Sequence, residues 1–332
     1  MKPEIREFIG NHQLYFESMG KEKKISNIGK NVGVSVPAVY SFLESGVKYG
    51  VIKKEGKNVF FENIGNFAGI YVTDKGIEIG IFDSRFNEIG FKFKERHGKF
   101  QKHEIIDAFM ETKKEYQFLY AAVVVDSAVK DGEQIEFGTD SYNIFTCPDL
   151  LSAQDCVVVN STIIKIIYIR QFITTKKNLL YYNLRLKQFS IIEDNQLKER
   201  TYDEYYGILP HFKDENDEVM QRLFELKGEE YDEYYQKNKE KLYSHIVPDI
   251  RSMLCMLRPD IFYIDGGIIK PQYIVKSNIS EDIDKFCFHD ILGRYNMYVR
   301  PICFIDPSTR ELLKVAAAKY AKYKFLNWKL IW

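Results

Sequence analysis

The residues best suited to chemistry near the start of the chain are the basic and hydroxyl side chains of a predicted helix and a predicted hairpin. The hairpin turn over residues 53–58 carries three lysines and an asparagine, and such side chains contact phosphate oxygens. The helix before it, over residues 35–47, presents small polar side chains that could reach base edges. The candidate contact residues are Ser35, Pro37, Ala38, Tyr40, Ser41, Lys53, Lys54, Lys57 and Asn58. These residue types predict nucleic-acid binding and include no evident catalytic group.

Capping and turn-forming residues define the elements that must position these side chains. Apolar residues at helical spacing predict a first helix over residues 5–19, which Gly20 ends. Ser26 is placed to cap a short second helix that runs through Asn31. Gly33 then supplies the tight turn that leads into the third helix.

The third helix is the element that would enter a nucleic-acid groove. Ser35 is placed to cap it, and Pro37 lies in its first turn, where proline is tolerated. Its expected buried residues are Val36, Val39, Phe42, Leu43 and Val47. Gly50 ends the helix, and a hairpin follows over residues 51–61. This order is typical of a winged helix-turn-helix, whose third helix lies in the major groove of DNA while the basic wing contacts phosphates.

The third helix is unusual for a DNA-reading element, because it has no Arg or Lys between Ser35 and Val47. Bidentate contacts to guanine are therefore not available from it, and Tyr40 and Ser41 would have to read the bases. A module of three helices and a hairpin that binds another protein remains the alternative.

The charge of the chain is distributed unevenly. The 47 basic and 47 acidic residues cancel, which excludes a histone-like polycation. Residues 1–65 carry 10 basic and 7 acidic residues, a net +3, and residues 307–332 carry 6 and 1, a net +5. Residues 193–240 carry 7 and 15, a net −8. Any nucleic-acid contact is therefore expected at the ends of the chain.

The five cysteines give no sign of a disulfide framework or a metal site. They are scattered, without Cys-x-x-Cys spacing, at Cys147, Cys156, Cys255, Cys287 and Cys303. We expect reduced thiols in a cytoplasmic protein. The N-terminus has no apolar signal segment, and the apolar run over residues 163–169 is interrupted by Lys165 and too short to span a membrane.

From Asn66 onward, predicted strands and helices alternate, which indicates an α/β fold. The expected strands are 69–72, 77–82, 89–91, 119–125, 156–159, 179–186, 189–192 and 261–264, and the expected helices are 103–114, 161–172, 216–226, 230–243 and 308–330. A hairpin set occurs twice, which suggests a duplicated fold. The two acidic helices, 216–226 and 230–243, should pack their tyrosines on the core, with a ligand or partner surface as the alternative. The lysines of the terminal helix should face solvent, with a second DNA site as the alternative.

The chain resembles the ROK family of sugar kinases and sugar-responsive repressors over nearly its whole length. Residues 33–40 and 49–52 are similar to the family's helix-turn-helix segment in unbroken register. Further matches, in the family's order, are 69–70, 80–83, 159–161, 207–211 and 265–267. The resemblance implies a winged helix-turn-helix over 1–65 and a two-lobed, duplicated actin-like (RNase H-like) ATPase fold. Its first lobe would span 66–160, completed by a C-terminal helix over 307–332, and its second lobe 161–306.

The departures from the family's kinases concern the residues that do chemistry. Phosphoryl transfer needs glycines around the phosphates, an acid that anchors a metal, and a base. Ser161 stands at the position of the catalytic Asp, and Ile208 at that of a sugar-contacting Glu. The phosphate segments, 71–75 and 184–189, lack the family's acid and glycines. We therefore expect no catalytic residue, no cofactor and no enzyme activity.

The resemblance implies a transcription regulator, a repressor, that binds a double-stranded DNA operator as a homodimer. A small-molecule effector of unknown identity would bind near Asn160, Ser161, His211, Gly266 and Gly267. The family's zinc site retains only His211, and Cys255 is the one cysteine between His211 and Ile261, so no metal is expected. Two alternatives stay open: a ROK-like sugar kinase, and a non-enzymatic interaction protein.

Overall fold

The computed structural model describes most of the chain as two compact units. The described residues are 1–21, 24–72, 76–95, 102–125, 128–130, 133–135, 156–183, 188–198, 218–257, 259–265, 302–304 and 310–330. The first unit contains those within 1–124, 147–157 and 317–330. The second contains those within 125–146 and 158–316.

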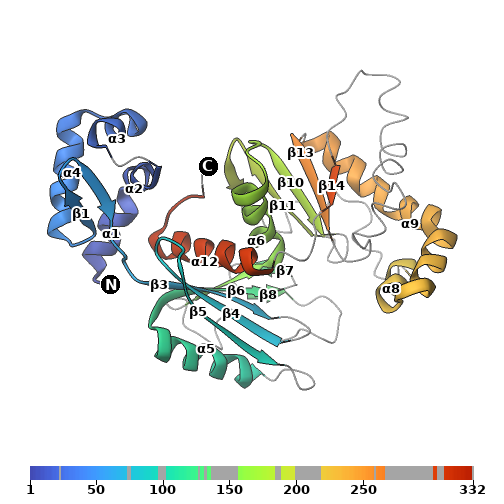
Figure 1. Cartoon of the computed structure of the whole chain (residues 1–332). Coiled ribbons are helices and arrows are strands. Elements are labelled where there is room, and N and C mark those ends of the chain that lie inside the picture. Colours follow the sequence, from blue (N-terminus) through green and yellow to red (C-terminus); the bar gives the residue numbers. More distant parts are fainter. Residues whose placement is uncertain are drawn as a thin grey trace. The chain divides into compact units, whose positions relative to one another are not determined.

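The N-terminal region begins with short helices and ends in a two-stranded hairpin (Figure 1). The elements are α1 (Pro3–Asn11), α2 (Gln13–Lys21), α3 (Ile25–Val32), α4 (Val36–Lys48), β1 (Ile52–Glu55) and β2 (Asn58–Phe61). The single helix predicted over 5–19 is wrong, because the backbone leaves the helical conformation at His12, where φ is −117° and ψ is 32°. The prediction that Ser26 caps α3 is also wrong, since the N-cap residue is Lys24.

An aromatic cluster packs α4 on α1 and α2. The Phe42 ring lies at its centre, with centroid distances of 5.7 Å to Phe8, 5.3 Å to His12, 4.4 Å to Tyr15 and 5.3 Å to Phe16. Such aromatic contacts contribute stabilisation beyond the apolar area that they bury. They fix the orientation of α4 and therefore of its opposite face.

The structure corrects two predictions about α4, which concern the burial of two valines and the capping hydrogen bond of Ser35. Val39, Phe42 and Leu43 are buried as predicted, but Val36 is 47% exposed and Val47 is 48% exposed. Both valines lie near the ends of the helix, and Gly46 extends the buried stripe instead, where an added Cβ would lie 2.3 Å from Ile52 Cδ1. Ser35 is the N-cap residue, with an extended backbone, but its side chain makes no capping hydrogen bond.

A five-stranded sheet has the order β5-β4-β3-β6-β9. The elements of this region are β3 (Asn66–Val72), β4 (Gly76–Asp83), β5 (Glu88–Glu95), α5 (Lys102–Tyr116), β6 (Phe118–Val125), the short strands β7 (Ala128–Lys130) and β8 (Glu133–Ile135), and β9 (Cys156–Asn160). β3 pairs antiparallel with β4 and parallel with β6. Every residue of β4 is buried, while the edge strand β5 is largely exposed.

A second five-stranded sheet has the order β12-β11-β10-β13-β14. Its strands are β10 (Leu179–Asn183), β11 (Gln188–Glu193), β12 (Gln196–Lys198), β13 (Ile261–Asp265) and β14 (Ile302–Phe304). Both sheets therefore follow one order, in which the first three strands form an antiparallel meander and the fourth joins the first in parallel. This repetition supports the duplication suggested by the two hairpin sets, and the predicted α/β class is confirmed.

The helices of the second unit differ in length from the predictions. The helix expected over 161–172 is α6 (Ser161–Tyr168), which continues as the π-helix η2 (Ile169–Ile173). The acidic helices are α8 (Glu218–Glu225) and α9 (Gly228–Leu257), so α9 is much longer than the expected 230–243. Tyr231 and Tyr235 are fully buried, which confirms the predicted packing for these two tyrosines.

The terminal helix α12 (Arg310–Leu326) corrects the expectation that its lysines face solvent. Lys314 is 8% exposed and Lys322 is 6% exposed. Charge alone predicts exposure for these lysines, but Lys322 is surrounded by Phe61 of β2, Phe86 of the turn between β4 and β5, and Trp328, which follows α12. Within the described part of the chain, no helix is long and apolar enough to cross a membrane.

Candidate functional site

The exposed face of α4 and the β1–β2 hairpin meet at Tyr40 and Lys54. The Lys54 Nζ lies 5.6 Å from the centroid of the Tyr40 ring, and Tyr40 is 44% exposed. Ser35, Pro37 and Ser41 are also exposed, while Ala38 is half-buried. The structure thus brings candidate residues of the helix and of the hairpin onto a common surface.

The hairpin presents its basic residues to solvent. Its turn follows the pairing of Glu55 with Asn58, and Gly56 adopts a φ of 61°, which favours glycine. The exposed candidate residues are Lys53, Lys54, Lys57 and Asn58, and Glu55 is exposed beside them. Lys53 Nζ lies 2.8 Å from Glu55 Oε1, and the hydrogen bond with Glu55 raises the pKa of Lys53. Glu55 therefore balances part of the charge of Lys53, whereas no described ion pair engages Lys54 or Lys57.

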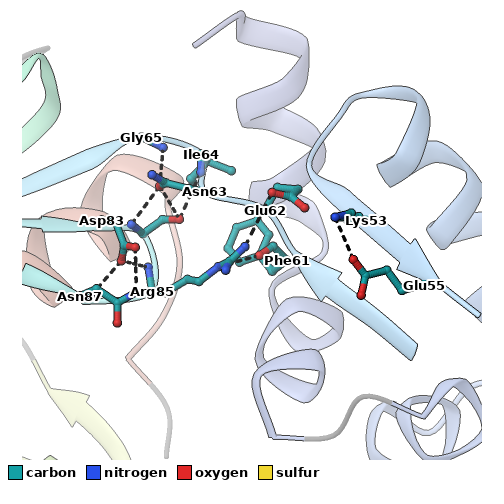
Figure 2. A network of polar contacts seen from close by, with 11 residues as sticks. Lys53, Glu55, Phe61, Glu62, Asn63, Ile64, Gly65, Asp83, Arg85 and Asn87 are labelled. Carbon is teal, nitrogen blue, oxygen red and sulfur yellow. Dashed lines mark hydrogen bonds and ion pairs between the residues drawn. The ribbon is translucent and has the colours of Figure 1, made fainter. Parts of the chain in front are cut away.

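A polar network joins the end of the hairpin to the turn between β4 and β5 (Figure 2). Arg85 Nε donates to the Phe61 carbonyl at 3.0 Å, and its guanidinium lies 3.7 Å from Glu62. Asn63 Oδ1 accepts hydrogen bonds from the Ser84 N–H at 3.2 Å and the Ser84 hydroxyl at 3.1 Å. The segment after the hairpin is therefore held by specific hydrogen bonds.

Lys322 contributes to the same junction from α12. Its Nζ donates to the Ser84 carbonyl at 2.7 Å. The centroids of the Phe61, Phe86 and Trp328 rings lie 5.0, 5.1 and 5.3 Å from Nζ. Burial lowers the pKa of Lys322 to about 7. The lysine thus connects the hairpin, the β4–β5 turn and the C-terminal segment.

The segment after α12 packs directly on the N-terminal helices. Trp328 Nε1 donates to the Ile9 carbonyl at 3.0 Å, and the Lys329 N–H donates to Gln13 Oε1 at 2.8 Å. Tyr323 donates its hydroxyl hydrogen to Glu17 at 2.8 Å, and burial, followed by the charge of Glu17, raises the pKa of Tyr323 well above its usual range. Residues more than 300 positions apart in the chain therefore support the same helices.

The candidate effector residues Asn160 and Ser161 lie where β9 meets α6. Asn160 caps α6, because its Oδ1 accepts the Thr162 N–H at 2.7 Å, and its Nδ2 donates to Gln188. The Thr162 and Ser190 hydroxyls are 2.8 Å apart. Ser161 is 3% exposed, and its hydroxyl has no hydrogen-bond partner among the described residues.

An ion pair in the second unit engages the last residue of β13. The Lys165 ammonium pairs with Asp265 Oδ2, and the Tyr181 hydroxyl donates to the same oxygen at 2.8 Å. Asp265 is thus neutralised by partners of its own chain and accepts a hydrogen bond from a neighbouring strand.

The other proposed effector residues, His211, Gly266 and Gly267, lie outside the described residues. The sequence reasoning missed Lys165, Tyr181 and the contacts around Lys322. A signal existed for Lys165, which interrupts an otherwise apolar helix and so requires a buried partner. Among the residues that the structure describes, no cluster of three or more His, Cys, Asp or Glu could hold a metal, and Cys156 is buried and forms no disulfide.

Comparison with known proteins identifies the fold through structures alone. No family model and no curated protein matches the sequence. A ROK family transcriptional regulator, described as a homologue of the E. coli MLC protein, aligns with a TM-score of 0.65 at 13% identity over 96% of this chain and 98% of its own. The chain has the fold of ROK family proteins.

Other ROK structures match a smaller share of the chain. A ROK family protein from Streptococcus pneumoniae, in complex with sucrose, aligns with a TM-score of 0.56 at 13% identity, over 79% of this chain and 97% of its own. The ROK hexokinase from Thermus thermophilus aligns with a TM-score of 0.53 at 11% identity, over 78% and 99%. Both structures are covered almost completely while about a fifth of this chain remains unmatched.

Proposed function

We propose that this protein is a DNA-binding transcription regulator with a winged helix-turn-helix over residues 1–65 and a non-enzymatic ROK-type domain. The observation that carries the proposal is the surface on which the exposed face of α4 adjoins a basic hairpin through Tyr40 and Lys54. A helix for the major groove beside lysines for the phosphates is the arrangement that DNA recognition requires.

The extent of the structural similarity supports the same proposal. The regulator aligns over 96% of this chain, whereas the hexokinase aligns over 78%. The difference, 96 − 78 = 18%, is close to the share of a 65-residue N-terminal domain in a chain of 332 residues. An additional N-terminal module is what distinguishes a ROK regulator from a ROK kinase in this proposal.

The proposed regulator acts as a homodimeric repressor. Two-fold symmetry lets each recognition helix contact one half-site. The contacts of both helices then contribute to the affinity for one operator, even if each helix makes few strong contacts. A small-molecule effector near Asn160 and Ser161 would bias the geometry of the two heads by binding in the ROK-type domain. The effector is unlike a hexose held by carboxylates, because Ser161 and Ile208 stand at the two acidic positions.

The proposal that the protein has no kinase activity rests on the chemical groups at Asn160, Ser161 and Asp265. An amide at Asn160 and a hydroxyl at Ser161 provide no base near neutral pH. The nearby acid of β13, Asp265, is engaged by Lys165 and Tyr181. We therefore propose that phosphoryl transfer does not occur.

Neutralising the three hairpin lysines is expected to weaken DNA binding on all sequences alike. The Lys53→Gln, Lys54→Gln, Lys57→Gln variant should also have a shallower salt dependence, because each phosphate contact contributes about 0.9 to the slope of log K against log salt. Fluorescence anisotropy between about 50 and 200 mM salt measures both quantities. Because Glu55 balances part of the charge of Lys53, we expect the slope to change by the contribution of about two phosphate contacts rather than three.

A matched control changes the same total charge elsewhere. Lys114, Lys176 and Lys177 are exposed and lie outside the proposed DNA surface. Their triple replacement by glutamine should leave the slope unchanged. An equal change of slope in both variants would contradict the assignment of the wing.

The sugar kinase alternative, favoured by the hexokinase similarity, predicts measurable sugar binding and ATP turnover. We expect neither: titration calorimetry with glucose, N-acetylglucosamine and xylose should give no heat at millimolar concentration. Each lost carboxylate leaves a sugar hydroxyl unpaired at a cost of about 1–3 kcal/mol, so two losses weaken binding roughly a hundredfold or more. A coupled ATPase assay with the same sugars completes the test, and micromolar sugar affinity or turnover would contradict the proposal.

A further inference from the structure

The exposed face of α4 is mainly apolar and hydroxylic. Val36, Tyr40 and Val47 are 47%, 44% and 48% exposed. The other exposed side chains are Pro37, Ser41, Glu44 and Lys48. The first two turns thus expose a valine, a proline, a tyrosine and a serine, and no charged group.

Base recognition in the major groove depends on the side chains that are available. Guanine is read by Arg or Lys, and adenine by Asn or Gln in a bidentate contact. The whole of α4, from Val36 to Lys48, contains no Arg, Asn or Gln, and its one lysine is its last residue. Glu44 could accept a hydrogen bond from cytosine, but it lies two turns into the helix.

Thymine is the base that an apolar surface recognises. Its C5-methyl group projects into the major groove, where aliphatic and aromatic side chains contact it. The N-terminal residues of a recognition helix are the ones that reach base edges. In α4 these residues are Val36 and Pro37, with Tyr40 one turn further on.

Charge complementarity supports DNA as the occupant of this face. Lys54 lies over the Tyr40 ring, and the exposed Lys57 and Asn58 form the neighbouring hairpin turn. An apolar strip of Val36, Pro37 and Tyr40 beside exposed lysines matches thymine methyl groups flanked by phosphates. The lysines supply affinity that is independent of the DNA sequence. The choice among DNA sequences is therefore left to the apolar strip of α4.

We infer that the first two turns of α4, through Val36, Pro37 and Tyr40, select half-sites that present thymine methyl groups to the N-terminal end of the helix. This inference rests on the proposed function, since it names the DNA that the same surface prefers. It differs from that function in predicting that one methyl group, rather than a hydrogen bond, carries the discrimination.

The test begins with the full chain and a randomised duplex pool, from which a preferred site is selected. Each thymine of that site is then replaced by deoxyuridine, which removes the methyl group and preserves base pairing and charge. Burial of one methyl-sized group is worth about a fourfold change in affinity. We expect roughly that loss at each contacted thymine, with an unchanged salt slope. Where cytosine replaces a contacted thymine, 5-methylcytosine should restore part of the affinity.

Two valines of the same helix provide the matched variants. Val36→Ala should reduce the difference between thymine and deoxyuridine sites, whereas Val47→Ala, equally exposed but in the last turn, should retain it. Circular dichroism confirms that both variants fold.

The outcomes separate the inference from the proposed function. Sequence-selective binding with equal affinity for thymine and deoxyuridine overturns the inference and leaves the proposed function standing. Full discrimination in Val36→Ala also overturns it, because another group then reads the methyl. Failure to bind any duplex overturns the proposed function itself and would make the α4 face a protein-docking surface.

Discussion

Replacing Trp328 with alanine is expected to lower the free energy of unfolding of the first unit by about 3–5 kcal/mol. Trp328 is 7% exposed, and its indole N–H donates to the Ile9 carbonyl of α1. Its ring centroid lies 6.1 Å from that of Phe16 and 5.4 Å from that of Tyr323. The substitution would leave a cavity between the C-terminal segment and the N-terminal helices. Urea unfolding, followed by circular dichroism, measures the loss.

Two glycines test the same packing by an independent route. A Cβ at Gly10 of α1 would lie 2.8 Å from the Leu326 carbonyl oxygen, a backbone atom that cannot rotate away. Gly10→Ala should therefore destabilise the unit, although alanine is the better helix former by about 1 kcal/mol. At Gly20 of α2 no atom lies within 4 Å of an added Cβ, so Gly20→Ala should be neutral or stabilising. Equal effects of the two substitutions, or an inert Trp328→Ala, would contradict the packing of this segment on α1.

The elements of the N-terminal region could largely be predicted because their signals are local. Gly33 adopts a φ of 78° where a turn was expected, and Pro37 lies in the first turn of α4. The exposure of Val36 could not be predicted, because Val36 continues the apolar spacing of Val39 and Leu43 but is the first residue of α4. The same holds for the break at His12, where the apolar pattern continues although the helix does not.

The candidate effector site could be predicted only in part. The step from β9 into α6 places Asn160 at the cap, as an asparagine after a strand suggests. The pairing of Lys165 with Asp265 joins residues 100 positions apart, and their packing against Tyr181 depends on strands that meet only in the folded sheet. Charge usually predicts exposure, so the burial of Lys322 could not be predicted from the sequence. Its aromatic surroundings come from three separate segments, which no local pattern connects.

Lys322→Met is expected to stabilise the protein at pH 6 and to lose that advantage as the pH rises. Burial lowers the pKa of Lys322 to about 7, the charge of Lys319 lowers it further, and Glu17 and Asp83 act in the opposite direction. In the unfolded chain a lysine titrates near 10.4. Between these two values the unfolded state binds more protons than the native state, so this group makes stability increase with pH. Below pH 7 both states are charged, and the full cost of burying the ammonium remains.

The size of the effect follows from the difference between the two pKa values. At about 1.4 kcal/mol per unit, a difference of roughly three units makes the buried charge cost about 4–5 kcal/mol at pH 6. Methionine fills a similar volume without a charge, but it loses the hydrogen bond to the Ser84 carbonyl, worth about 1 kcal/mol. We therefore expect a net gain of about 3 kcal/mol at pH 6 that declines steadily between pH 7 and pH 10.

Urea unfolding of the two proteins at a series of pH values from 6 to 10 measures this difference. Lys329→Met is the matched control, because its side chain is exposed and its backbone bond to Gln13 does not depend on the side chain. The control should differ from the unsubstituted protein by a constant amount at every pH. A gain for Lys322→Met that does not vary with pH would mean that Lys322 stays protonated in the fold. In that case the rings of Phe61, Phe86 and Trp328 would stabilise the cation as fully as water does.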